Sequence, residues 1–148
     1  MATVAVPSSN RIRILEAPHA RTITGFADEA IGRGQPVYRK ANGNFGVARA
    51  NAVGTAKLVG IATRDAAVGS PVEALFFGRL AGYDFSTTNP GTTIFLSATT
   101  AGALDNAAIT GTGNVLVPVG TVHVFTDDAL TRYLFVDIPQ NANPAALP

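Results

Sequence analysis

Gly34-Gln35-Pro36-Val37-Tyr38, a turn followed by a strand with an aromatic residue, occurs in related form twice in this chain of 148 residues. It returns 57 positions later as Gly91-Thr92-Thr93-Ile94-Phe95, and Val59-Gly60-Ile61-Ala62 returns 60 positions later as Val119-Gly120-Thr121-Val122. Two copies are too few for a stacked array, which needs three or more units. The repeat therefore predicts two related sheets that close on one core.

The rest of each half follows in the same order. Gly43-Asn44-Phe45 matches Gly102-Ala103-Leu104 at 59 positions, and each half ends in a strand, at 72–77 and at 133–138. The offset between the halves grows along the chain, which indicates small insertions in the loops. We interpret the shared glycines as residues of turns or bulges.

The local patterns are those of an all-β protein with little helix. Arg11-Ile12-Arg13-Ile14-Leu15 alternates polar and apolar residues, as in a strand that buries one face. Only residues 28–31 and 48–57 are candidates for a short helix, and Gly54 weakens the second. Further strands are expected at residues 22–26, 37–40, 45–49, 58–63, 72–77, 80–85, 93–97, 115–124 and 133–138.

We expect one compact β-sandwich or small barrel-like domain over residues 21–139. Its two similar strand-turn halves are expected at about 30–85 and 88–138. Residues 1–20 are predicted to form an extended N-terminal arm, and residues 140–148 a Pro-rich C-terminal tail. Such arms often make contacts between subunits.

The beginning of the chain has no apolar segment of the kind that a secretory signal needs, because Arg11 and Arg13 interrupt it early. No stretch approaches the ~20 apolar residues of a membrane-spanning helix. We therefore expect synthesis in the cytoplasm of the cell that makes the protein, and no membrane partner.

Charged residues make up only 14% of the chain, against roughly 25% in typical soluble domains. Glycine, alanine, threonine and proline fill their place. A surface with so few charges repels other subunits weakly, which favours an oligomer or a lattice. The chain has no cysteine, which excludes disulfide bonds, thiol catalysis and cysteine-ligated zinc.

The charges are divided unequally between the halves. Residues 1–79 carry ten basic and five acidic side chains, a net charge of +5, whereas residues 80–148 carry one basic and five acidic side chains, a net charge of −4. The halves could attract each other, or the basic half could face an acidic neighbour. Solvated surface charges, which contribute little on average, are the simpler interpretation.

No combination of residues predicts catalysis, a cofactor site or a metal site. His19 and His123 lie far apart in the sequence and have no metal-ligand spacing. A triad of Ser97, His123 and Asp127 can be assembled only arbitrarily, because no Gly-x-Ser-x-Gly elbow presents the serine. We expect a protein that is not an enzyme. Its net charge of +1 and the absence of a dense basic cluster also predict no direct nucleic-acid partner.

At the repeated units the sequence resembles the capsid decoration, or cement, proteins of tailed bacteriophages, a family related to head-fibre modules. The resemblance covers residues 30–138. The residues that carry it are Gly34-Gln35-Pro36-Val37-Tyr38, Val59-Gly60-Ile61-Ala62, Ala67-Val68-Gly69-Ser70-Pro71-Val72-Glu73-Ala74, Gly78-Arg79-Leu80, Gly91-Thr92-Thr93-Ile94-Phe95-Leu96-Ser97, Gly102-Ala103-Leu104, Val119-Gly120-Thr121-Val122 and Leu134-Phe135-Val136-Asp137-Ile138.

This resemblance implies a structural virion protein on the outer surface of the capsid, which bridges major capsid protein subunits and assembles with itself, as a trimer. The family has no catalytic residues to transfer. We expect contacts to the capsid or to other subunits from the N-terminal arm and the exposed loops. The basic residues predicted to make them are Arg11, Arg13, Arg33, Arg39 and Lys40.

The alternative is a fibre or receptor-binding module that recognises host glycans or proteins. It would need an exposed aromatic surface, for which Tyr83, Phe85 and Tyr133 are the candidates. We expect these three residues to belong to the core or to an interface.

Overall fold

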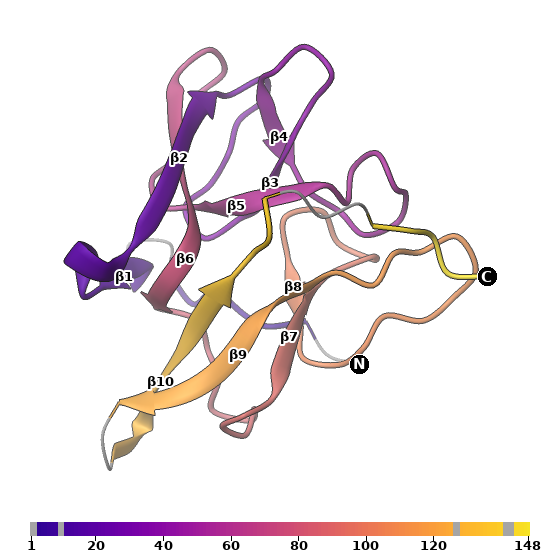
Figure 1. The fold of residues 1–148 in the computed structure, drawn as a ribbon. Coiled ribbons are helices and arrows are strands. Elements are labelled where there is room, and N and C mark those ends of the chain that lie inside the picture. The colour runs from indigo at the N-terminus through magenta and orange to yellow at the C-terminus, as the bar shows by residue number, and fades with distance from the viewer. Residues whose placement is uncertain (1–2, 9–10, 126–127, 141–143) are drawn as a thin grey trace.

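A computed structural model describes residues 3–8, 11–125, 128–140 and 144–148 of the chain, and the side chains of residues 125–131 lie outside the description. The described residues form an almost all-β fold, a curled antiparallel sheet that makes a half-barrel (Figure 1). The prediction of an all-β, barrel-like domain is confirmed. The elements are β1 (Arg13–Leu15), η2 (Ala17–His19), β2 (Arg21–Phe26), β3 (Pro36–Arg39), β4 (Phe45–Val47), β5 (Leu58–Ala62), β6 (Pro71–Ala81), β7 (Thr93–Leu96), β8 (Leu104–Asp105), β9 (Pro118–Phe125) and β10 (Asp128–Asp137).

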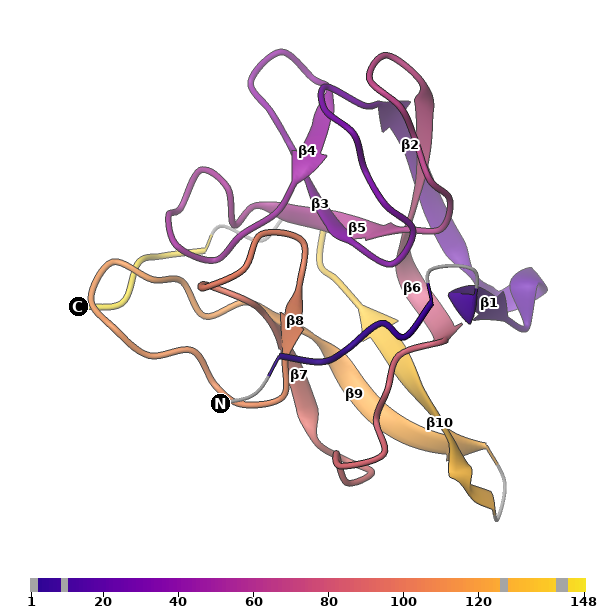
Figure 2. The ribbon, with the colours of Figure 1, turned by 180° about the vertical axis from the view of Figure 1, so that it is seen from behind.

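The order of strands in the sheet is symmetrical about its centre. It runs β4-β3-β5-β6-β10-β9-β7-β8, so that β6 and β10, the last strand of each half, lie side by side. Strands β1 and β2 also pair with β6, outside this path. Figures 1 and 2 show the first half above and the second half below, joined along β6 and β10.

The pairing inside the two halves has the same irregularity. The ladder between β3 and β5 shifts register after Val37 pairs with Gly60. The ladder between β7 and β9 shifts in the same way after Ile94 pairs with Gly120. These four residues occupy the same places in the repeat, so both halves carry a β-bulge at the valine that precedes the glycine.

Each half also has its own apolar core. The smaller core cluster contains Val37, Phe45 and Val59, and the larger contains the corresponding Ile94, Leu104 and Val119. The larger cluster also takes in residues of the first half, among which are Leu58, Ile61 and Leu75. The second half is therefore covered by the first.

Some local predictions were wrong. Residues 28–31 and 48–57 form turns, bends and bridges, and η2 is the helical element that the described residues contain. Residues 72–77 and 80–85 were predicted as two strands, but Pro71–Ala81 is one strand that continues through Gly78. Strand β8 was not predicted as a strand, because two residues show no alternation. No helix in the described part of the chain is long and apolar enough to cross a membrane.

The described parts of both termini lie against the body instead of projecting as arms. Thr3 and Ala5 form bridges with Asp105 and Asp84, and Val4 is buried. Near the other end Ala146 forms a bridge with Val115. Packing against the body buries apolar side chains such as Val4, which an extended arm would leave in water. Burial of this apolar surface favours the packed position.

Candidate interaction surface

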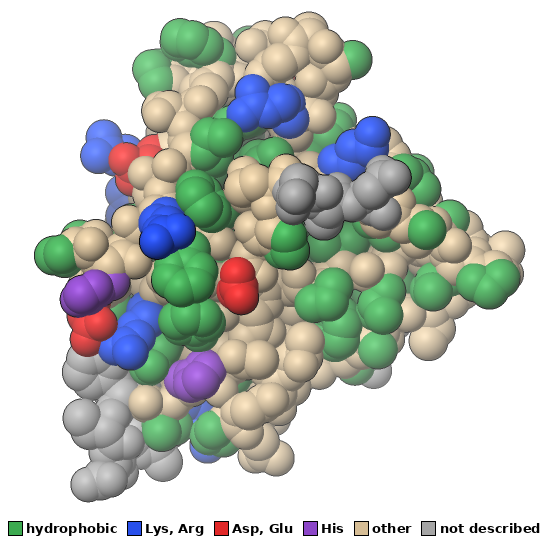
Figure 3. Space-filling model, viewed as in Figure 1, with side chains coloured by type: hydrophobic (Ala, Val, Ile, Leu, Met, Phe, Trp, Pro, Cys, Tyr) green, Lys and Arg blue, Asp and Glu red, His purple; other side chains and the backbone are tan. Residues whose placement is uncertain are grey.

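An aromatic face covers the outer side of β6, β10 and β9. We define it by Phe77 and Arg79 on β6, Tyr133 and Phe135 on β10, and His123 on β9. On each strand these residues alternate with buried ones such as Leu80, Leu134 and Val122, so the pleat turns them away from the core. In Figure 3 hydrophobic side chains run between basic, acidic and histidine side chains on this side of the molecule.

The aromatic rings contact one another across the strands. Phe77 and Phe135 meet edge to face, with ring centroids 5.4 Å apart, and His123 stacks on Tyr133 at 5.8 Å. His123 also contacts Phe135 at 5.8 Å. Such contacts hold the rings in defined positions and contribute about 0.5–1.5 kcal/mol each beyond their burial.

Two arginines extend this surface. The guanidinium of Arg21 lies 5.6 Å from the centre of the Phe77 ring, and that of Arg79 lies 5.6 Å from the centre of the Tyr133 ring. Arg79 also forms an ion pair with Glu16 at 2.8 Å. Tyr133 is therefore enclosed between His123 and Arg79 and is only 7% exposed.

A groove of about 530 Å³ runs along the β9 side of the aromatic face. Its polar lining residues include Thr93, Thr121, His123, Arg79 and Asp137. The Thr121 hydroxyl lies 2.8 Å from Nε2 of His123 and sets the orientation of that ring. The groove thus combines exposed ring edges with several hydrogen-bonding groups.

Phe77 and Phe135 pack against neither of the two core clusters. Both side chains are only partly buried, whereas phenylalanine is among the residues that are most often fully buried in folded proteins. Their rings contact each other, His123 and Arg21. This part of the surface is therefore ordered without being needed to close the core.

A second exposed apolar surface, the apolar tip, lies at the far end of β6. It consists of Phe26, which is 57% exposed, and Val68, which is 70% exposed. Phe26 pairs with Pro71 and Arg21 pairs with Phe77, so the tip and the aromatic face lie six positions apart along β6. At about 3.3 Å per residue, the two surfaces are roughly 20 Å apart.

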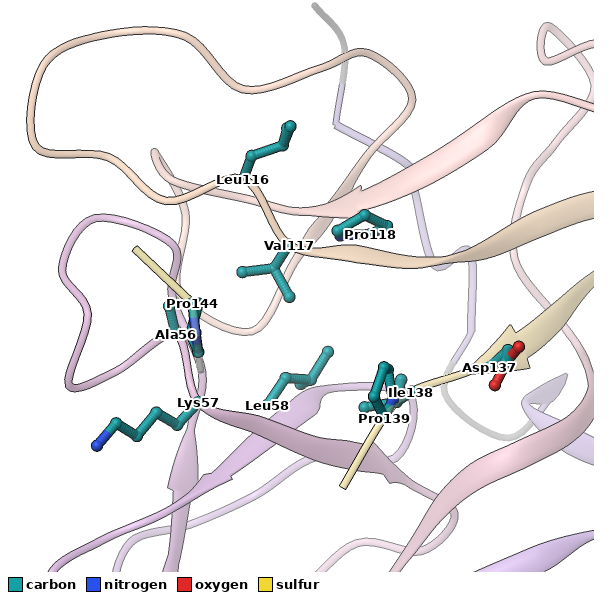
Figure 4. Close-up of a pocket in the computed structure, with 10 residues that line it drawn as sticks. All are labelled: Ala56, Lys57, Leu58, Leu116, Val117, Pro118, Asp137, Ile138, Pro139 and Pro144. Atoms are coloured by element: carbon teal, nitrogen blue, oxygen red, sulfur yellow. The ribbon is translucent and has the colours of Figure 1, made fainter. Parts of the chain in front are cut away.

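An apolar pocket of about 290 Å³ lies between the end of β10, the start of β5 and the segment that enters β9 (Figure 4). Leu58, Val117, Ile138 and Pro144 line it. Its polar groups are those of Lys57 and Asp137 at the margin. The pocket has no arrangement of polar groups that would orient a substrate.

The five basic residues predicted as contact residues do not form one patch. Arg11 and Arg13 border a hollow beside Tyr83 and Asp84, whereas Arg39 and Lys40 border a different hollow beside Thr55 and Gln140. Their role in contacts stays a prediction.

Two of these basic side chains already have partners within the chain, and Arg33 is bound through its backbone. Lys40 forms an ion pair with Asp28 at 3.3 Å, and Arg39 lies over the ring of Phe45 at 5.1 Å. The backbone N–H of Arg33 donates to the carboxylate of Asp65 at 2.7 Å. Arg39 and Lys40 thus belong to the hairpin of β3 and β4.

The aromatic residues suggested for a receptor-binding surface are buried. Tyr83 is 7% exposed and its hydroxyl donates to the carbonyl oxygen of Gly34 at 2.6 Å. Burial raises the pKa of Tyr83, so this hydroxyl keeps its proton. Phe85 is 2% exposed. Among these three residues only Tyr133 belongs to the aromatic face.

No group of three histidine, aspartate or glutamate side chains within the described ranges could hold a metal ion. Ser97 is fully buried, and its hydroxyl accepts hydrogen bonds from the backbone N–H groups of Thr99 and Thr100. It therefore shapes a turn. Asp127, the third residue of the arbitrary triad, lies outside the described residues.

The sequence contained a signal for the aromatic face. Tyr133, Phe135 and Asp137 alternate with apolar residues, and Phe77 and Arg79 do the same. The alternation does not reveal that β6 pairs with β10, and it is this pairing that places Arg79 opposite Phe135. That pairing joins residues more than fifty positions apart.

No family model and no curated protein matches this chain. The aromatic face, the apolar tip and the resemblance of the repeat pattern are thus the features on which a functional proposal can rest.

Proposed function

We propose that this protein is a structural virion protein, without catalytic activity, that binds the outer surface of a tailed-phage capsid as an oligomer. In this role it bridges major capsid protein subunits and stabilises the shell. Three copies per oligomer is the number that the resemblance implies.

The observation that carries the proposal is the presence of two separate surfaces on one sheet, the partly exposed aromatic face and the exposed apolar tip. A bridging protein must hold at least two neighbours at once. The aromatic face and the apolar tip lie at different places along β6, so two neighbours can be bound without competing. Exposed apolar clusters of this kind typically mark sites of protein–protein contact.

We assign the capsid contact to the apolar tip. Phe26 and Val68 are the most exposed large apolar side chains in the described chain, and burying such a side chain stabilises a complex by about 1.5–3 kcal/mol. Many subunits bound to one shell multiply this modest energy, because each bound copy favours the shell form that it recognises.

The experiment mixes the purified protein with expanded, undecorated heads and images them by cryo-electron microscopy. We expect ordered density on the outer surface, and weaker binding for Phe26→Ser and Val68→Ser. Leu116→Ser is the matched control, because Leu116 is 42% exposed but lies beside the apolar pocket, away from the tip. The absence of density at saturating protein would overturn the proposed function.

A fibre or receptor-binding module is the second candidate. It is favoured by the groove beside His123 and Phe135, where ring edges lie next to Thr93, Thr121 and Asp137. Binding to a glycan array, together with failure to bind empty heads, would favour this function over capsid decoration.

A further inference from the structure

The two halves differ in the burial of equivalent residues. The residues of the first half that correspond to part of the aromatic face are buried, whereas those of the second half are partly exposed. Ile61 pairs with Leu75 in the first half as Thr121 pairs with Phe135 in the second. Ile61 and Leu75 have no exposed surface, and both belong to the larger core cluster. In the second half Thr121 and Phe135 remain partly exposed.

The described residues leave Thr121 and Phe135 only partly covered. We propose that a second copy of this chain covers them, so that the aromatic face is the surface through which copies associate. This inference rests on the proposed self-association but not on the number of three copies, because contact between identical faces joins copies in pairs. It is independent of whether the oligomer binds a capsid.

The charges around the aromatic face suit contact between identical surfaces. Phe77 pairs with Arg21 on one side and with Asp137 on the other. Arg21, Phe77 and Asp137 therefore form a row of cation, ring and anion across three strands. Arg21 and Asp137 are exposed, and neither forms an ion pair with a described residue.

A row with a cation at one end and an anion at the other is complementary to a copy of itself. Arg21 of one copy can meet Asp137 of the next, while the rings of Phe77 and Phe135 lie between them. Opposite charges then face each other, where a surface of one sign would repel its copy. A receptor glycan would have no such need for paired charges.

The composition of the face is that of an interface core. Aromatic residues and arginine are enriched in protein–protein interfaces, and tyrosine and arginine are over-represented among the residues that dominate binding. Tyr133 and Arg79 are held in place by stacking before any partner arrives. A preorganised surface loses less conformational entropy when it binds.

The first test reverses the charges of the row and measures association by sedimentation velocity over a wide range of protein concentration. Arg21→Asp and Asp137→Arg should each raise the dissociation constant between copies by about tenfold or more, as expected for loss of a close charge pair. The double variant Arg21→Asp/Asp137→Arg should restore association. Failure of the double variant to associate better than the single variants would overturn the pairing.

The second test places a charge at the centre of the face. Phe135→Asp should give monomers at concentrations where the unmodified protein is oligomeric, with the same far-ultraviolet circular dichroism, because Phe135 is not part of a core cluster. Phe26→Asp at the apolar tip is the matched control and should leave the oligomer intact.

The full-length protein is used in both tests, without heads, so the result does not depend on capsid binding. An unmodified protein that stays monomeric at every concentration, or an oligomer that Phe135→Asp leaves unchanged, would overturn the inference. Loss of glycan-array binding on Phe135→Asp in a monomeric protein would instead assign the face to a saccharide.

Discussion

At the scale of single residues, the tip of the hairpin formed by β3 and β4 is held by a polar cluster around Asp28. The side-chain amide of Asn44 donates to the Asp28 carboxylate at 3.2 Å, and Lys40 forms an ion pair with it at 3.3 Å. The hydrogen bond from Asn44, followed by that from Lys40, lowers the pKa of Asp28 below its ordinary value of 3.8. Lys40, one of the basic residues predicted to make contacts with other subunits, is thus already paired within the chain.

Asp28→Asn should remove part of the acid sensitivity of the fold. Because the pKa of Asp28 is lower in the folded state than its ordinary value of 3.8, its contribution to stability is present above that pH and is lost as the pH falls through the folded pKa. The melting temperatures of Asp28→Asn and of the unmodified protein should differ near neutral pH and converge in strong acid. Equal differences at all pH values would contradict this.

At the scale of elements, the Val-Gly step of each half brings two neighbouring strands into close contact. A Cβ atom on Gly60 would lie 2.9 Å from the backbone oxygen of Leu75, and one on Gly120 would overlap the backbone oxygen of Phe135. Because both obstacles are backbone atoms, no side-chain rotation can relieve them. The two halves therefore share a close contact between neighbouring strands at this glycine, in addition to their turns.

Gly120→Ala should lower the free energy of unfolding by at least about 1–3 kcal/mol, the usual cost of overpacking. Gly54→Ala is the control, because no atom lies within 4 Å of the Cβ that it adds. It should change stability by less than about 1 kcal/mol. Urea denaturation followed by circular dichroism measures both. Equal stability of the two variants would show that the strands separate easily at Gly120.

At the scale of the whole molecule, the N-terminal segment is part of the body. Ile12 is 1% exposed and belongs to the larger core cluster, and the backbone N–H of Val4 donates to the carbonyl oxygen of Leu104 at 2.7 Å. A segment that fills the core cannot detach to bind a partner without exposing that core. Removal of residues 1–14 should therefore destabilise the fold as well as any docking.

Ile12→Ala should reduce the free energy of unfolding by about 2–5 kcal/mol, as for other large-to-small substitutions in a packed core. Val6→Ala is the control in the same segment, because Val6 is 39% exposed. Its effect should be well below that of Ile12→Ala in thermal or urea unfolding. A small effect of Ile12→Ala would show that the segment behaves as a detachable arm.

The all-β class and the positions of most strands could be predicted from the sequence, because alternation of apolar residues and glycine-rich turns are local properties. Residues 37–40 and 58–63, for example, lie within one or two residues of β3 and β5. Residues 48–57 were a candidate for a short helix, but they form turns and bends in which Ala48 and Ala50 are buried in the larger core cluster.

The aromatic face could not be predicted, because it depends on contacts between distant parts of the chain. Phe135 and Leu75 have equivalent places in the repeat and similar apolar character, yet only Leu75 is buried. The repeat, with its glycine turns and apolar strand residues, can be recognised from the sequence alone. Which of the two equivalent positions is buried depends on tertiary packing, because Leu75 lies in the larger core cluster and Phe135 lies in neither cluster.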